Sequence, residues 1–225
     1  GGDPALRGQS GSLKVTLPHW PHPICEAFVQ GAQELGMPLN PDYNGASQQG
    51  VGYFQRTIHQ GWRVSTSAAF LRPAQRRSNL RVVTGAQVQR IQMTDAAATG
   101  VEYVQAGVLR TVRARREVIV CAGAINTPKL LMLSGIGDGH RLRELGMETH
   151  AHLPGVGRHL KDHFSIRLVA RVRNAITINE LARVPRLWGQ AASWLRGKPS
   201  ILALSPSVVH WFWQSQPGLP RPDLQ

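Results

Sequence analysis

The most constraining feature of the sequence is an apolar run that leads through a glycine into a helix-start signal. Val118–Ala122 lacks the polar–apolar alternation of a half-buried strand. A strand that is apolar on both faces is typical of a parallel sheet covered by helices. After Gly123, Thr127 is a good N-cap and Pro128 suits the first helical position. This order predicts an α/β layer whose backbone a dinucleotide could approach, although any α/β crossover would show the same pattern.

The other segments alternate between strand and helix patterns, which favours a mixed α/β fold. Apolar residues recur at helical spacing between Pro23 and Gly36, which is a plausible C-cap. Two valine-containing runs, 101–105 and 108–113, flank Ala106-Gly107 and predict a hairpin. Further strands are expected at 13–17, 80–84, 86–93, 118–122, 168–172 and 208–213, and a further helix at 181–195.

The strong positive charge bounds the possible partners. The formal net charge is +13, from 26 Lys and Arg against 13 Asp and Glu, and such an excess attracts anions. The arginines are dispersed, and no basic run interleaved with aromatic residues indicates a nucleic-acid module. Solvated surface is therefore the favoured interpretation. A basic, nonenzymatic module that binds nucleic acid or another anion stays open as the alternative.

Cysteine usage and hydropathy bear on the compartment. Cys25 and Cys121 are far apart and each lies in an apolar run, so both are expected to be buried thiols in a reducing, cytoplasmic environment. No apolar stretch reaches the roughly 18 residues that a membrane span needs, and no signal peptide is recognised. The sequence opens with Gly1-Gly2 rather than Met, and further residues are expected upstream.

Several polar residues permit other chemistry. Four histidines have spacings that a metal site could use, but no cysteine or carboxylate cluster completes a ligand shell, so no metal is expected. Three serines lack the glycine elbow and the paired His–Asp of a nucleophilic site. Asp162 is adjacent to His163, and adjacent side chains in an extended loop usually diverge, which disfavours a direct acid–base pair. The histidines are His150, His152, His159 and His163, and the serines are Ser65, Ser67 and Ser134.

The segment from Gly123 to Gly137 resembles, position by position, the second signature of the glucose-methanol-choline (GMC) oxidoreductase family. The resemblance rests on two small residues before Thr127-Pro128, an aliphatic pair, and a closing Ser-Gly-Ile-Gly. Upstream, Asn40–Gly45 resembles the family's central region. Downstream, Leu153–His163 is similar to its "LPGVGxNLxDH" stretch. The resemblance covers nearly the whole chain, is weakest after Arg173, and is nearest to the choline dehydrogenase-like branch.

The resemblance implies an FAD cofactor, a small-molecule alcohol substrate and an electron acceptor that the sequence does not identify. It implies that the backbone of Val88 meets the adenine, that Ala122 and Gly123 pass close to the dinucleotide, and that Asp162 and His163 face the isoalloxazine or the substrate. It assigns no catalytic residue within the chain. No nucleic-acid partner and no metal are expected.

The resemblance also implies a domain organisation. Part of an FAD/NAD(P)-binding Rossmann-like domain, at 80–137, is expected to be interleaved with a substrate domain built on an antiparallel sheet, at 1–79 and 138–225. The family's GxGxxG strand–turn–helix and its catalytic histidine are expected outside these residues. The chain by itself is therefore expected neither to hold FAD tightly nor to oxidise alcohols.

Overall fold

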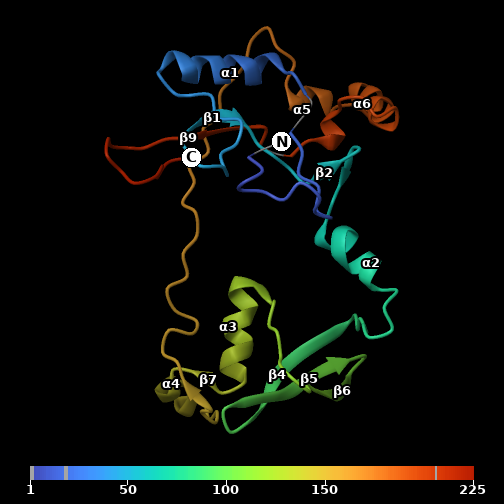
Figure 1. Ribbon diagram of the computed structural model, residues 1–225, viewed down its shortest axis with the longest axis vertical. Helices are drawn as coiled ribbons and strands as arrows, with labels where there is room; N and C mark the ends of the chain where they lie inside the picture. The colour runs from blue at the N-terminus through green and yellow to red at the C-terminus, as the bar shows by residue number, and fades with distance from the viewer. Residues whose placement is uncertain (1–2, 18–19, 206) are drawn as a thin grey trace. The chain divides into compact units, whose positions relative to one another are not determined.

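The computed structural model describes residues 3–17, 20–205 and 207–225 (Figure 1). The chain divides into two compact units. Unit 1 contains residues up to Leu80 together with Val169–Gln225, and unit 2 contains Arg81–Leu168. Among the described residues, no helix has the length and apolar character needed to cross a membrane.

Unit 1 is built on short antiparallel strand pairs. Strand β1 pairs with β9 in a register that places Val51 opposite Trp211, and β2 forms a hairpin with β3. The elements of the unit are α1 (Pro23–Glu34), β1 (Gly50–Tyr53), β2 (Ile58–His59), β3 (Trp62–Arg63), the π-helical turn η1 (Ser67–Leu71), α2 (Arg72–Ala74), α5 (Ile178–Leu181), α6 (Arg186–Leu195), the 3-10 turn η2 (Ile201–Ala203) and β9 (Val209–Phe212).

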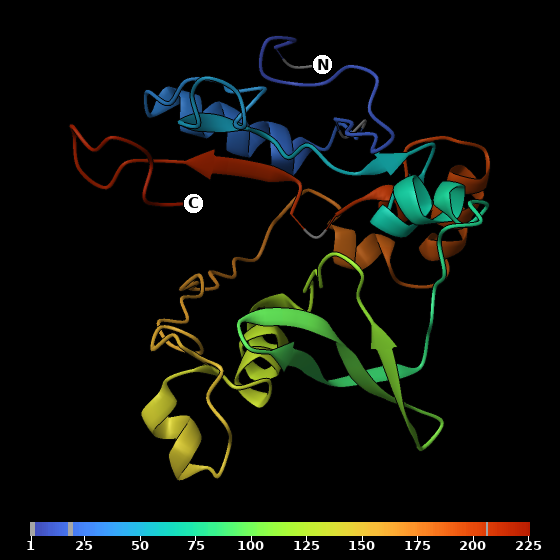
Figure 2. The same cartoon turned by 60° about the horizontal axis from the view of Figure 1, so that its bottom comes forward.

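The core of unit 1 lies between α1 and the β1–β9 pair. Val29 and Ala32 of α1 pack against the fully buried Val51 of β1. The ring nitrogen Nδ1 of His22 accepts the backbone N–H of Ile24 and so caps the start of α1. Helix α1 lies alongside the strand pair in two views (Figures 1 and 2).

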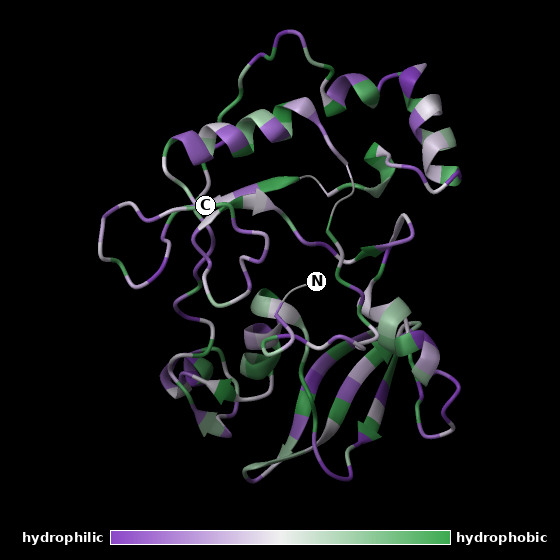
Figure 3. Cartoon of the chain, turned by 45° about the horizontal axis from the view of Figure 1, so that its top comes forward, coloured by the Kyte–Doolittle hydropathy of each residue, from purple (hydrophilic) through white to green (hydrophobic). Residues whose placement is uncertain are grey.

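Unit 2 centres on a three-stranded antiparallel sheet of order β4-β5-β6, with α3 packed against β4. Hydrophilic and hydrophobic residues alternate along these strands (Figure 3), as expected for a sheet with one solvated face. The guanidinium of Arg90 donates to the carboxylate of Glu102 on the neighbouring strand at 2.6 Å. The elements are β4 (Ala86–Thr94), β5 (Ala97–Gln105), β6 (Val108–Arg113), α3 (Gly123–Leu133), β7 (Ile136–Gly137), α4 (Gly139–Glu144) and β8 (Ala151–His152).

Several expected strands are absent from the described part of the chain. Segments 80–84, 118–122 and 168–172 are not strands, and in 13–17 a single bridge joins Thr16 to Arg56. A β-strand is defined by backbone hydrogen bonds to a neighbouring strand. Among the described residues, no neighbouring strand forms such bonds with segments 80–84, 118–122 and 168–172. The expected burial of Val118–Ala122 is accordingly wrong: Ile119 is 75% exposed, and Cys121 is exposed rather than buried.

Two helix boundaries also differ from expectation. Helix α3 begins at Gly123, five residues before the expected start at Pro128, so that Pro128 lies inside it and not at its first turn. An interior proline removes one hydrogen-bond donor and crowds the carbonyl four residues earlier, but α3 continues past Pro128 to Leu133. Of the helix expected over 181–195, only Arg186–Leu195 forms α6, with Pro185 as its N-cap, and the preceding α5 ends at Leu181.

Candidate functional site

The N-terminus of α3 is an exposed end of the helix in unit 2. Gly123 has a φ of +83°, and a Cβ placed on it would meet no atom of the described residues within 4 Å. The N-cap, Ala122, offers no side-chain cap to the first turn within the described chain. Residues 122–126 are exposed. Because the first N–H groups of a helix have no intrahelical partner, this end presents donors and the positive end of the helix dipole to an approaching ligand.

The opposite end of α3 is closed by Ser134. Its hydroxyl donates to the backbone carbonyl of Leu130 at 2.6 Å and accepts the backbone N–H of Ile91 at 2.8 Å. Ser134 is 4% exposed and Ile91 is 5% exposed. The serine therefore ties α3 to β4, a positioning role that the sequence analysis did not assign. The nucleophile hypothesis gains no support, because the hydroxyl is buried and engaged twice.

Two of the four histidines lie in the segment that packs against the turn after α3. Gly135 has a φ of +76°, and its carbonyl accepts the backbone N–H groups of His150 at 2.8 Å and Ala151 at 3.1 Å. The ring nitrogen Nδ1 of His152 accepts the backbone N–H of Gly139 at 2.9 Å. These contacts fix the loop that joins β7 to β8. Across the residues with a described position, no group of three or more His, Cys, Asp or Glu side chains is arranged to hold a metal.

Val88 lies on β4, opposite Tyr103 of β5, and is partly buried. The strand register shifts between Val88 and Arg90, which is a β-bulge. The side-chain amide of Gln87 donates to the Val88 carbonyl at 3.4 Å. The Val88 carbonyl can therefore accept a hydrogen bond from a polar group that lies beside β4.

Asp162 and His163 lie on an irregular, exposed segment of unit 2. A carboxylate oxygen of Asp162 accepts the backbone N–H of His163 at 2.8 Å, as in a local turn. The neighbouring Phe164 is 91% exposed. The structure thus brings Val88, Ala122 and Gly123 onto two elements that pack together, whereas it does not place Asp162 and His163 against them.

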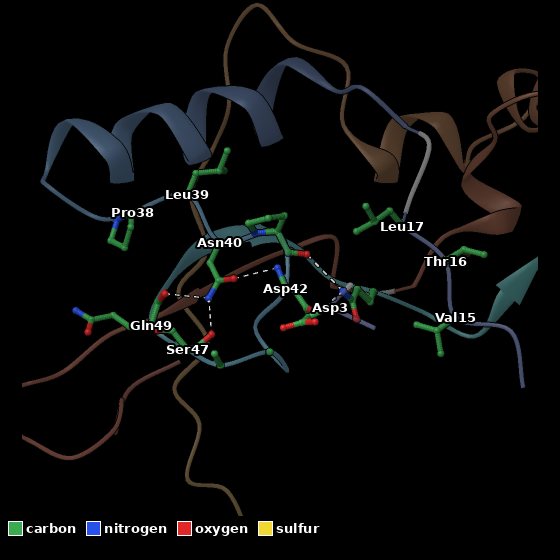
Figure 4. Close-up of a pocket in the computed structure, with 14 residues that line it drawn as sticks. Asp3, Val15, Thr16, Leu17, Pro38, Leu39, Asn40, Asp42, Ser47 and Gln49 are labelled. Carbon is green, nitrogen blue, oxygen red and sulfur yellow. Dashed lines mark hydrogen bonds between the residues drawn. The ribbon is translucent and has the colours of Figure 1, made fainter. Parts of the chain in front are cut away.

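Unit 1 contains a cavity of about 730 Å³ that the sequence analysis did not identify (Figure 4). Asn40 organises its wall: Nδ2 donates to the carbonyls of Ser47 at 2.9 Å and Gln49 at 3.0 Å, and Oδ1 accepts the N–H of Asp42 at 2.9 Å. Arg7 is ion-paired with Asp42, one of the lining residues. The turn-rich stretch from Asn40 to Gly45 was the available signal, because such turns commonly shape loops that line sites.

A buried histidine lies in an aromatic cluster of the same unit. His210 is 2% exposed, and its ring centroid is 4.5 Å from that of Tyr43, 5.2 Å from Phe54 and 5.3 Å from Phe212. Neither ring nitrogen has a hydrogen-bond partner in the described structure. Burial lowers the pKa of His210, an effect that the nearby Gly50 backbone partly offsets. The cluster therefore favours the neutral imidazole.

The chain belongs to the GMC oxidoreductase family, whose model matches residues 3–165. It is 39% identical to mitochondrial choline dehydrogenase of Homo sapiens over 97% of this chain and 37% of that protein. It is also 39% identical to oxygen-dependent choline dehydrogenase of Rhizobium johnstonii over 100% of this chain and 41% of that protein. An FAD-dependent oxidoreductase from Chaetomium thermophilum superposes with a TM-score of 0.82 at 25% identity, over 94% of this chain and 38% of that one.

These comparisons confirm the resemblance to the GMC family and to its choline dehydrogenase-like members. They also confirm a mixed α/β fold shared with solved structures of oxidoreductases. The chain spans about two fifths of the length of the relatives it matches.

Proposed function

We propose that the protein is an FAD-dependent oxidoreductase that oxidises the CH–OH group of a primary alcohol. In this proposal residues 80–137 contribute to the FAD-binding domain, and 1–79 and 138–225 contribute to the substrate domain. The observation that carries it is the open, glycine-led N-terminus of α3 within the region that matches the family.

The residues at this end of α3 fit a dinucleotide. Gly123 has open space where a side chain would stand, so a ligand can approach its backbone closely. The free N–H groups of the first turn can donate to phosphate oxygens. The backbone of Val88 is proposed to meet the adenine. Bound FAD would supply the hydride acceptor, and Asp162 and His163 are proposed to face the substrate or the flavin ring.

No catalytic base is assigned within residues 1–225. Alcohol oxidation by hydride loss needs a positioned group that takes the hydroxyl proton, because negative charge develops on the oxygen. The electron acceptor is likewise left unassigned. The 225 residues contain no GxGxxG sequence, so we expect this stretch alone neither to retain FAD on gel filtration nor to oxidise alcohols.

A matched glycine pair tests the proposal in the full-length protein. Gly123 and Gly107 both have positive φ, +83° and +78°, and a Cβ on either would meet no described atom within 4 Å. Substitution by valine should strain both backbones by about 1–2 kcal/mol. Gly123→Val should lower the FAD-to-protein ratio, measured by absorbance after gel filtration, whereas Gly107→Val should not. Equal flavin occupancy in the two variants would refute the placement of the dinucleotide.

The net charge of +13 favours a second candidate, a nonenzymatic module that binds nucleic acid or another anion. A gel shift with DNA or RNA that persists at physiological ionic strength and weakens steeply with salt would support it.

We also propose a cytoplasmic location. Cys25 and Cys121 are both free thiols, as is typical of a reducing compartment. Subcellular fractionation tests this location.

A further inference from the structure

Helix α6 carries an exposed apolar face. Trp188 is 71% exposed and Leu195 is 77% exposed. They are seven residues apart, which places them on the same side of the helix. Val184, just before the helix, is 69% exposed. We call Val184, Trp188 and Leu195 the α6 face.

The opposite side of α6 is anchored in unit 1. The indole N–H of Trp194 donates to the Gly61 carbonyl at 2.9 Å, and its ring lies 4.6 Å from that of Trp62. The side-chain oxygen of Gln190 accepts the backbone N–H of Ile201 at 3.0 Å, and its backbone carbonyl accepts the Ser200 hydroxyl at 2.9 Å. These contacts fix the rotation of the helix, so the α6 face points away from the elements that hold it.

The sequence around the α6 face is mostly positively charged. Residues 169–225 contain seven Arg or Lys and two acidic residues, Glu180 and Asp223. The Asp223 carboxylate is engaged locally, because it accepts the Ser215 hydroxyl at 2.6 Å. The Glu180 carboxylate is engaged locally, because it accepts the backbone N–H of Thr177 at 2.7 Å and the Thr177 hydroxyl at 3.1 Å. The basic residues that flank the face in sequence are Arg183, Arg186, Arg196 and Lys198.

We propose that the α6 face docks on the surface of a bilayer that contains anionic phospholipid. Trp188 and Leu195 would insert at the boundary between headgroups and acyl chains, where amphipathic aromatic rings are favoured. The flanking Arg and Lys would meet the lipid phosphates. Nucleic acid is disfavoured as the occupant, because a phosphate backbone leaves the aliphatic Leu195 and Val184 without a partner. The attachment is peripheral, lies along the surface, and is independent of the proposed chemistry.

Vesicle co-sedimentation tests the proposal in the full-length protein. Pure phosphatidylcholine vesicles are compared with vesicles that also contain phosphatidylglycerol, at low and physiological salt. Binding to the anionic vesicles is expected, and it should weaken with salt. Arg186→Gln should lower the partition coefficient by about fivefold, and Arg76→Gln, an equal charge loss at an exposed position elsewhere in unit 1, should change it little. Leu195→Ser should also weaken binding, whereas Leu35→Ser, at a residue that is 73% exposed, should not.

Tryptophan fluorescence gives a second readout that does not depend on loss of binding. Brominated lipids should quench the unmodified protein more than Trp188→Phe, because Trp188 is the tryptophan placed in the membrane. Circular dichroism should be the same for all variants, since every substituted side chain is exposed. Equal binding to neutral vesicles, equal effects of Arg186→Gln and Arg76→Gln, or undiminished quenching in Trp188→Phe would each overturn the proposal. So would binding to DNA that requires Arg186 and ignores Leu195.

Discussion

Replacing Ser134 by alanine should destabilise unit 2 where α3 meets β4. The hydroxyl bridges the Leu130 carbonyl, at 2.6 Å, and the Ile91 N–H, at 2.8 Å. The carbonyl can keep a partner, because the backbone N–H of Ser134 also donates to it, at 3.1 Å. The Ile91 N–H would lose its partner in a site where both residues are at most 5% exposed.

The expected cost follows from that unpaired donor. Leaving a buried N–H unsatisfied costs about 1–3 kcal/mol, more than the net gain of an ordinary hydrogen bond. Alanine also removes little volume, so cavity formation adds only a small amount. If Ile91 exchanges through local opening, its amide hydrogen should exchange roughly 5- to 150-fold faster in Ser134→Ala.

Amide hydrogen exchange is the suitable assay, because all six tryptophans of the chain lie in unit 1 and do not report on unit 2. Ser165→Ala is the matched control, since Ser165 is an exposed serine of the same unit. Its exchange at Ile91 should equal that of the unmodified protein. If Ser134→Ala also left the Ile91 amide protected, the serine bridge would not hold α3 on β4.

Three further outcomes are expected. Gly135→Ala should lower the free energy of unfolding, measured with urea, by about 2–4 kcal/mol, because its Cβ would lie 2.6 Å from the Glu148 carbonyl oxygen at a φ of +76°. A loss no greater than that of Gly107→Ala would contradict this. His163→Ala should alter turnover or substrate affinity while FAD stays bound, and His140→Ala, at an exposed residue of α4, should change neither. His210 has a pKa below its ordinary value of about 6.5, so the unfolded state binds more protons in that range, and stability should fall as the pH is lowered through about 6.5. His210→Phe should flatten that dependence of the urea midpoint, and an unchanged slope would argue against it.

Local patterns allowed some elements to be predicted from sequence. The hairpin at Ala106-Gly107 was predicted and is confirmed, because short-range alternation and a tight turn determine it. The pattern at Val118–Ala122 was misleading, since a strand depends on neighbouring backbone that hydropathy does not specify. The start of α3 was misplaced because Pro128 gave a strong but incorrect boundary signal.

The site was harder to predict than the elements. The aromatic cluster joins His210 to Tyr43 and Phe54, which are more than 150 positions away in sequence, so no local pattern could indicate it. Ser134 was considered only for its reactive hydroxyl. Its bond to Ile91 spans 43 residues and depends on how α3 packs against β4. Both features arise from tertiary contacts, which a single sequence does not display.

The glycines at the two ends of α3 meet different physical requirements, although they belong to one sequence signature. Gly123 and Gly135 both have positive φ, but a Cβ on Gly123 would stand in open space, whereas one on Gly135 would collide with the backbone of Glu148. A side chain at Gly135 must therefore disturb folding first. One at Gly123 adds strain but meets no atom of the described residues within 4 Å, so we expect any larger effect to come from a group that approaches the helix. The signature thus separates into a part that packs closely against the backbone before β8 and a part that leaves the first turn of α3 accessible. This separation is why flavin occupancy and unfolding free energy should respond differently to substitutions only twelve residues apart.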